Sequence, residues 1–319
     1  MPKLLHEPKK VSTFAAMESN GYHIPVLLGP SVGALNVRRG GVYVDVTLGG
    51  GGHTRRILEA LEGTGHLYSM DQDSDALEHF GADGLTNHTL VWSNFRHLRR
   101  WMRYYGVEGI DGLLADLGVS SHHFDDESRG FSLRMDAPLD MRMNRRAAST
   151  AADVVNTYTE EHLTSVLRLY GELRQARAMA TALVRARARQ PIQTTSQLVQ
   201  VLTPLTAPQH SKKELAQAFQ ALRIEVNHEM DALAQMLGAA TTLLRPGGRL
   251  VVLSYHSLED RIVKNMIRSG NIEGQVQTDI YGRGSSPLVA VGRPLTANND
   301  EVEANPRSRS AVMRVAEKR

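Results

Sequence analysis

Short apolar runs alternate with segments of helical periodicity over the first third of the chain. Each apolar run predicts a strand, and turn residues follow it before an amphipathic segment begins. We expect strands at 42–46, 66–70, 89–92 and 110–115, with helices at 54–62, 74–80 and 95–105 between them. Strands that alternate with helices predict a parallel sheet with right-handed crossovers, so the fold class is α/β.

The pattern changes after about residue 140, where the strand signals stop. Helical periodicity predicts helices at 160–170, 174–189 and 196–202, and one continuous helix over 211–243. We expect a buried strand at 250–254, a helix at 259–267, a surface excursion over 271–305 and a last strand at 311–315. The sheet is therefore interrupted, after its fourth strand, by a helical insertion.

These patterns define the expected domains. We place the sheet domain at 23–140 and 215–319, the inserted helical domain at 141–214 and a flexible tail at 1–22. The tail contains Lys3, Lys9 and Lys10 but also Glu7 and Glu18. It lacks the long apolar segment of a secretory signal and is too acidic for a typical mitochondrial presequence.

Composition narrows the class of protein. A chain of 319 residues with 41% hydrophobic and 22% charged residues is ordinary for a soluble globular protein. No apolar stretch is long enough for a membrane helix, so we expect no membrane partner. The absence of cysteine excludes disulfides, thiolate metal sites and a cysteine nucleophile. Because the net charge is only +3, a polyanionic partner has to be inferred from local clusters of basic residues.

The strongest chemical signal is the run VYVDVTLGGGGH at 42–53, in which a strand leads into glycines and then a helix. Glycines let the backbone approach a ligand closely, and we expect Gly50, Gly51 and Gly52 to do so. The spacing differs from the G-x-G-x-x-G of dinucleotide-binding proteins. Asp45 would repel a pyrophosphate but suits a ligand that carries an ammonium and a sulfonium, which favours S-adenosylmethionine over a nicotinamide cofactor.

Two later positions extend this cofactor site. Asp71 ends the second strand, where an acidic residue accepts hydrogen bonds from ribose hydroxyls. Phe95 follows the third strand, where its ring can pack on the adenine or serve as an aromatic anchor of the core. A ribose contact at Asp71 and an adenine contact at Phe95 fit S-adenosylmethionine and a nicotinamide cofactor alike.

Several sequence blocks resemble the RsmH/MraW family, whose members methylate the exocyclic N4 of a cytidine in small-subunit ribosomal RNA. The blocks are LADLGVSS at 114–121, RGFS at 129–132, PLDMR at 138–142, YHIPVLL at 22–28, FQALRIEVN at 219–227, HSLEDRIVK at 256–264 and NPRSRSA at 305–311. The resemblance implies a class I methyltransferase fold, Rossmann-like, with an inserted helical domain and S-adenosyl-L-methionine as cofactor. It also implies cofactor contacts at Gly51, Gly52, His53, Asp71, Phe95 and Asp116.

The chain departs from the family at three places. His123 stands where the family uses a glutamine near the cofactor, and imidazole lacks the simultaneous donor and acceptor of an amide. Tyr255 replaces a usual phenylalanine, and Gly29-Pro30 stands where an acidic residue is common. The change at His122–His123 supports one alternative, a ribosome-assembly factor that keeps the methyltransferase fold with weakened or lost turnover.

Methyl transfer from a sulfonium is an in-line displacement, so the protein has to supply position and electrostatics. The chain lacks the Pro-Pro signature that many amino-methyltransferases have after strand four. We expect Asp116, with Ser120 and Ser121, to orient the target amine instead. The alternative for Asp116 is a carboxylate that caps the following loop.

Two further clusters are candidates. Asp140 and Arg142 form either a buried ion pair or a site in which Arg142 contacts a phosphate or a base. His256 lies after strand five and could face the substrate, while Ser257 and Asp260 have the spacing of a helix cap. A metal site at His256 would have two ligands at this spacing, so we predict no metal.

The partner is predicted from charge. No acidic residue occurs between Leu173 and Lys213, a stretch that contains Arg174, Arg177, Arg185, Arg187, Arg189, Lys212 and Lys213. Such a face either follows an RNA backbone or is a solvated helix face, and the resemblance favours RNA. Arg307 and Arg309 are further candidates. We expect a small ribosomal subunit or its precursor as substrate, in a bacterial cytoplasm or a mitochondrial matrix, and the oligomeric state stays open, a homodimer included.

Overall fold

The computed structural model describes residues 25–81, 84–119, 126, 128–276 and 286–319. The predicted tail at 1–22 lies outside this part of the chain. Three of the predicted site residues, Ser120, Ser121 and His123, also lie outside it.

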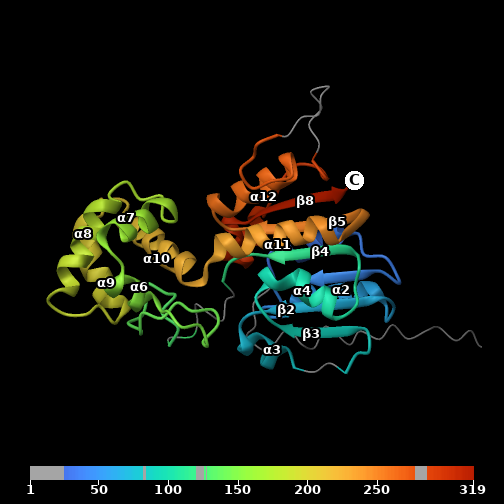
Figure 1. Ribbon diagram of the computed structural model, residues 1–319, viewed down its shortest axis with the longest axis horizontal. Coiled ribbons are helices and arrows are strands. Elements are labelled where there is room, and N and C mark those ends of the chain that lie inside the picture. Colours follow the sequence, from blue (N-terminus) through green and yellow to red (C-terminus); the bar gives the residue numbers. More distant parts are fainter. Residues whose placement is uncertain (1–24, 82–83, 120–125, 127, 277–285) are drawn as a thin grey trace, which may run out of the picture.

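One twisted sheet forms the larger part of the molecule (Figure 1). Its path runs in the order β3-β2-β1-β4-β5-β8-β6, and β7 pairs with β8 beside this path. The strands are β1 (Val42–Asp45), β2 (His66–Asp71), β3 (His88–Trp92), β4 (Ile110–Asp116), β5 (Leu244–Ser254), β6 (Leu288–Ala290), β7 (Leu295–Thr296) and β8 (Val312–Lys318). The first five strands run parallel and β8 runs antiparallel to β5. This order confirms the α/β class and the class I methyltransferase sheet.

Helices cover both faces of the sheet because its strands are apolar on both sides. Val251 packs in one core with α1 (Leu28–Leu35) and α2 (Gly52–Leu61). The next residue, Val252, faces the other core with α4 (Leu98–Tyr104), α11 (Glu229–Leu243) and α12 (Ser257–Ser269). Shorter elements complete the domain: α3 (Ser74–Phe80), η1 (Phe95–His97), α13 (Asn299–Ala304) and η3 (Pro306–Ser310).

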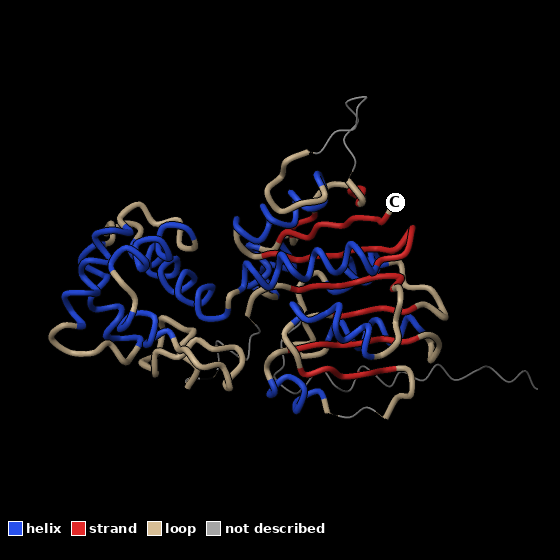
Figure 2. The backbone as a smooth tube through the Cα atoms, in the orientation of Figure 1, coloured by secondary structure: helices blue, strands red, loops and turns tan. Residues whose placement is uncertain are grey.

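A separate helical unit lies beside the carboxyl ends of the parallel strands (Figure 2). It contains α6 (Ala151–Thr157), α7 (Glu160–Leu169), α8 (Ala176–Arg187), α9 (Thr195–Leu202), η2 (Thr203–Leu205) and α10 (Ser211–Asn227). These helices share one apolar core that reaches from Phe131 to Val226. The residues that share this core therefore extend beyond the predicted insertion at 141–214 at both ends.

The prediction of one continuous helix over 211–243 is wrong. His228 adopts a left-handed conformation, with φ 49° and ψ 45°, and separates α10 from α11. The break lets α10 pack inside the helical unit while α11 packs on the sheet. Apolar periodicity continues across the break because both helices bury a face, so the pattern could not reveal it.

The segment 271–305 is more ordered than the predicted surface excursion. Its described part contains β6, β7 and α13, and both strands pair with β8. The predicted last strand at 311–315 is confirmed as the start of β8. Within the described ranges, no helix has the length and apolar character needed to cross a membrane.

Candidate active site

The predicted carboxylates meet at one edge of the sheet. Asp45, Asp71 and Asp116 are the last residues of β1, β2 and β4, which are neighbours in the sheet. Figure 1 shows that this edge faces the helical unit. The order of strands reverses between β1 and β4, and ligands of open α/β sheets bind outside the carboxyl ends at such a point.

The glycine loop is shaped by packing against two side chains. Gly51 has φ +76°, and a Cβ at this position would overlap the ring of Phe80. A Cβ at Gly52 would overlap the ring of Pro25. Glycine is therefore required here by neighbours within the protein, and the predicted approach of the loop to a cofactor stays a prediction. The helix that follows, α2, has no side-chain cap at its N-terminus.

Asp71 holds the same loop from the neighbouring strand. Its Oδ2 accepts a hydrogen bond of 2.9 Å from the backbone N–H of Gly49, and its Oδ1 accepts one of 3.0 Å from that of Asp73. Both oxygens of Asp71 thus hold the backbone around the glycine loop, and its hydrogen bonds to a ribose stay a prediction.

Asp45 is fully buried beneath the loop. Its oxygens accept hydrogen bonds from the backbone N–H of Thr47 at 3.1 Å and from the hydroxyl of Thr54 at 2.7 Å. The Thr54 hydroxyl in turn lies 2.8 Å from that of Ser69. Burial raises the pKa of Asp45 to about 6 despite these hydrogen bonds and the neighbouring His53. Asp45 therefore anchors the turn between β1 and the glycine loop. Its interaction with a cationic ligand stays a prediction.

Asp116 lies between a tyrosine and a histidine. The hydroxyl of Tyr255 donates a hydrogen bond of 2.6 Å to Oδ1, and Nδ1 of the buried His53 lies 3.8 Å from Oδ2. Burial raises the pKa of Asp116 to about 7, and burial lowers the pKa of His53. The neutral imidazole and the tyrosine thus surround a carboxyl group that changes charge near neutral pH.

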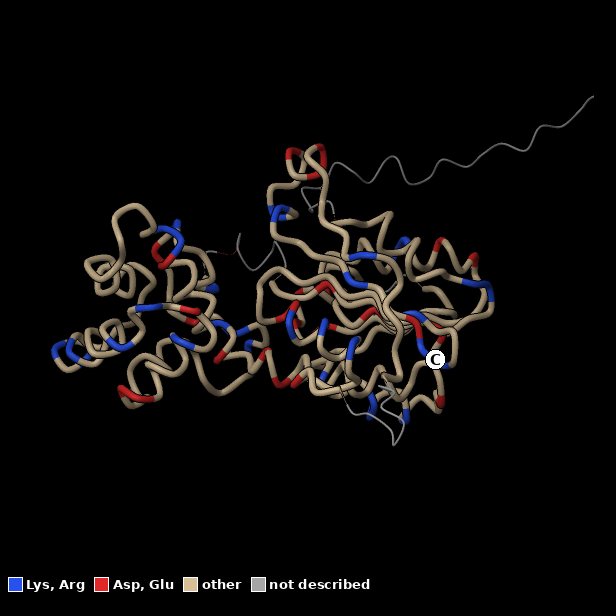
Figure 3. The backbone as a smooth tube through the Cα atoms, turned by 90° about the horizontal axis from the view of Figure 1, so that it is seen from above, with Lys and Arg blue, Asp and Glu red and all other residues tan. Residues whose placement is uncertain are grey.

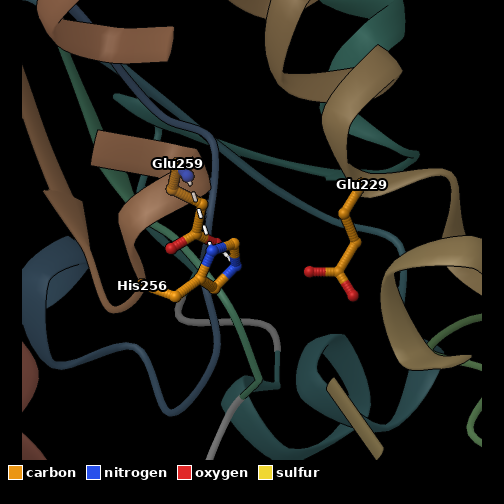
Figure 4. A group of neighbouring side chains, drawn as sticks. All are labelled: Glu229, His256 and Glu259. Atoms are coloured by element: carbon orange, nitrogen blue, oxygen red, sulfur yellow. Dashed lines mark hydrogen bonds and ion pairs between the residues drawn. The ribbon is translucent and has the colours of Figure 1, made fainter. Parts of the chain in front are cut away.

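A charged cluster is formed by Glu229, at the start of α11, and by His256 and Glu259, at the start of α12 (Figure 4). Glu259 accepts a hydrogen bond of 2.8 Å from the backbone N–H of Tyr255, and its Oε1 lies 3.2 Å from Nε2 of His256. Glu229 is held by two hydrogen bonds from Arg223, at 2.7 and 2.8 Å. Glu259 is buried and His256 is partly buried, and the imidazole of His256 faces the carboxylate of Glu259 in this structure.

This geometry corrects the predicted cap of α12. His256, and not Ser257, is the N-cap residue, and its Nδ1 accepts from the backbone N–H of Glu259. Ser257 instead donates to Glu172 of the helical unit, and Asp260 is paired with Arg314 of β8. The extended backbone of His256, with φ −143° and ψ 162°, makes it the residue before the first helical turn, and the spacing of Ser257 and Asp260 did not reveal this.

The cluster also has the composition of a metal site, because one ligand atom from each of Glu229, His256 and Glu259 lies within 4.8 Å of the others. Arg223 already engages both oxygens of Glu229 and so balances one of the two negative charges. We therefore interpret the cluster as an ion-pair network that joins α10, α11 and α12.

The second predicted cluster contains an ion pair. Arg142 donates to both oxygens of Asp140, at 2.8 and 2.7 Å, so the ion pair is present, but both side chains are 22% exposed and the pair is not buried as that alternative supposed. The loop that carries this pair is fixed by Arg129, which is buried and donates to the carbonyls of Arg142 and Met143. A catalytic role for Asp140 stays a prediction.

Arg129 also reaches the sheet domain, where its guanidinium lies 3.2 Å from the carboxylates of Asp73 and Asp75. Asn227 fixes the loop from the other side: it accepts from the backbone N–H of Met143 and donates to the carbonyl of Met141, both at 2.8 Å. The RGFS and FQALRIEVN blocks therefore form the junction between the two units. In the sequence, these two blocks stood out only through the family resemblance, which gave no sign of this structural role.

Phe95 begins η1 directly after β3 and is partly buried against the main core of the sheet. This position agrees with its anchoring role and leaves its contact with an adenine a prediction. The hydroxyl of Tyr255 was also missed as a site group. Its only sequence signal was the replacement of the family's usual phenylalanine.

Residues 20–319 match the model of the MraW methylase family. The chain is 56% identical to the ribosomal RNA small subunit methyltransferase H of Phocaeicola vulgatus, over 93% of this chain and 98% of that protein. Proteins of the same name from Bacteroides thetaiotaomicron and Parabacteroides distasonis are 53% and 55% identical, over 93% of this chain and 98% and 97% of theirs.

Proposed function

Because this chain belongs to the MraW methylase family, we propose that it transfers a methyl group from S-adenosylmethionine to the exocyclic N4 of a cytidine in small-subunit ribosomal RNA. The relatives named above are bacterial ribosomal RNA methyltransferases of nearly the same length. Their names support the RNA substrate, and their source supports a reaction in the bacterial cytoplasm.

The observation that carries the chemistry is the environment of Asp116. Cytosine N4 is a weak nucleophile because its lone pair is delocalised into the ring. An acceptor aimed at its N–H favours the pyramidal form, in which the lone pair is available for attack. Tyr255 holds Oδ1 of Asp116, so Oδ2 is the oxygen that we assign to the amine. The amine loses a proton once the new N–C bond forms, and a carboxylate with a pKa of about 7 is suited to accept it.

The residues at the carboxyl edge fit the cofactor. Bound there, S-adenosylmethionine would supply a methyl group on a positively charged sulfur. We assign Asp71, the last residue of β2, to the ribose hydroxyls, and the uncapped N-terminus of α2 follows the glycine loop. The carboxyl groups of Asp45 and Asp116 provide negative potential for a cationic ligand. His123, for which we keep the same assignment, lies outside the described residues.

The helical unit presents basic residues to the RNA. Arg174, Arg185 and Arg189 are exposed, whereas Arg187 donates to the carbonyl of Val155. Figure 3 shows blue segments recurring at the end of this unit farthest from the sheet. Exposed arginines in a stretch of sequence without acidic residues favour the backbone of a nucleic acid over a balanced surface.

The decisive experiment incubates purified small ribosomal subunits with the protein and S-adenosylmethionine that carries a labelled methyl group, followed by nucleoside analysis. We expect the label in N4-methylcytidine. Label in 5-methylcytidine or in a 2′-O-methyl nucleoside would reject the N4 assignment. Tight binding to the subunit without any transfer would instead support the non-catalytic assembly factor.

A further inference from the structure

A depression of about 400 Å³ lies between the segment that follows β3 and the outer face of α11. The two walls differ in character: one is basic and the other is polar and uncharged. Its lining includes Arg96, His97, Arg99 and Arg100 on the basic wall and Gln235 and Thr242 on the other.

The basic residues of this depression form no ion pair within the part of the chain that the structure describes. Arg99 and Arg100 are exposed and have no ion-pair partner among the residues that the structure describes. The stretch from 84 to 107 contains no acidic residue at all. Burial, together with the charges of Arg100 and Arg96, lowers the pKa of His97. Uncompensated arginines at a concave surface are a typical site for phosphate.

Arg96 adds a fixed guanidinium to the basic wall. Its Nη2 donates to the carbonyl of His228 at 3.3 Å, which holds the side chain in place. Its Nε makes no hydrogen bond to any residue that the structure describes, and no carboxylate of the described residues pairs with this guanidinium.

The depression is also close to the reaction centre along the chain and in space. Arg96 directly follows Phe95, at the carboxyl end of β3, and contacts His228, which precedes Glu229 of the junction cluster. In contrast, α8 lies at the far end of the helical unit (Figure 1). An RNA held only by α8 would lack an anchor beside the sheet domain, where its cytidine must enter.

We propose that this depression binds the phosphate backbone of the substrate RNA and fixes the strand beside the catalytic edge. The inference rests on the proposed function and adds an anchor on the sheet domain to the one on the helical unit. Beyond the depression, α4 presents Arg103 and Tyr104, whose side chain is 75% exposed. An exposed ring next to basic residues offers a stacking surface for an unpaired base.

The test compares the double variant R99Q/R100Q with wild type in binding to purified small subunits and to the protein-free RNA, over a range of salt concentrations. Two lost phosphate contacts should reduce the salt slope of log affinity by about 1.4, and weaken binding on the order of tenfold at 0.1 M salt. Affinity for S-adenosylhomocysteine, measured by calorimetry, should not change. The single variant R100Q, which removes one of the two contacts, should reduce the slope by about 0.7.

The matched control is R39Q/R56Q, which removes two exposed arginines that already pair with Glu62 and Glu59. We expect its salt slope to equal that of wild type. An unchanged slope in R99Q/R100Q, with wild type still methylating the subunit, would overturn this inference alone. Loss of binding to subunits but not to free RNA would assign the depression to an acidic protein and overturn it too. If wild type neither binds nor methylates the RNA, the proposed function fails as well.

Discussion

The hydroxyl of Tyr255 lies 2.6 Å from Oδ1 of Asp116 and joins the loop after β5 to the end of β4. These strands are neighbours in the sheet, with Asp116 paired in register to Leu253. A tyrosine at this place thus selects which oxygen of the candidate catalytic carboxylate remains available to the substrate.

The first prediction concerns this hydrogen bond. Tyr255→Phe removes a donor that stabilises the charged form of Asp116, so the pKa of Asp116 should rise above about 7. The acidic limb of the pH–rate profile should move to higher pH by about one to two units, the equivalent of one hydrogen bond to a charged group.

Tyr158→Phe is the matched control for this measurement, because its hydroxyl donates to a carboxylate, that of Glu225, inside the helical unit. Its profile should follow that of wild type. If the acidic limb of the pH–rate profile did not move in Tyr255→Phe, that limb would reflect the titration of a group other than Asp116.

The second prediction concerns Asp116 itself. Asp116→Asn keeps the size of the side chain but cannot accept a proton from the amine, so turnover at saturating cofactor should fall by roughly 10²–10⁴-fold. Asp111→Asn is the control, since Asp111 lies at the opposite end of the same strand and pairs with Arg245. If Asp116→Asn methylated the subunit at the wild-type rate in single-turnover assays, Asp116 would have no part in the reaction.

The third prediction concerns stability and pH. The folded state raises the pKa of Asp45 from 3.8 to about 6, so between these values the folded protein holds a proton that the unfolded chain has lost. The free energy of unfolding should therefore fall by on the order of 2–3 kcal/mol as pH rises from about 4 to 7. Asp45→Asn should abolish this contribution, as measured by chemical denaturation at several pH values.

Asp153→Asn provides a control of opposite sign. Hydrogen bonds from Thr150 lower the pKa of Asp153, so its contribution to stability is lost on acidification and not on alkalinisation. Identical pH dependence of stability in wild type and Asp45→Asn would show that the Asp45 carboxyl group titrates alike in the folded and unfolded chains.

The fourth prediction concerns the junction between the two units. Arg129→Met leaves the buried carboxylate of Asp73 without its guanidinium, and the free energy of unfolding should drop by about 3–5 kcal/mol. Arg145→Met, which removes a half-exposed arginine that pairs with Asp75 and Asp126, should cost no more than about 1 kcal/mol. Equal losses in the two variants would contradict the assignment of Arg129 as the central contact.

The fifth prediction separates an ion-pair network from a metal site at Glu229, His256 and Glu259. Because Arg223 engages both oxygens of Glu229, chelation should change neither the melting temperature nor the methylation rate. Added zinc should not raise the melting temperature. Stabilisation by stoichiometric zinc, lost in His256→Ala, would identify a metal site instead.

Much of this protein was determined by the sequence alone. Alternating strands and helices predicted the parallel sheet, and Asp45 and Asp71 were recognised at the ends of its strands. Local pattern suffices for such statements, because the period of apolar residues and the position of a strand's end depend on neighbours along the chain.

The tertiary structure decided the contacts between distant segments. The pairing of Tyr255 with Asp116 depends on β5 lying beside β4, and the approach of Glu229 to His256 depends on the left-handed turn at His228. Arg129 finds Asp73 only because the helical unit folds back onto the edge of the sheet. These contacts arise from packing between elements far apart in sequence, so the local periodicity of apolar residues does not predict them.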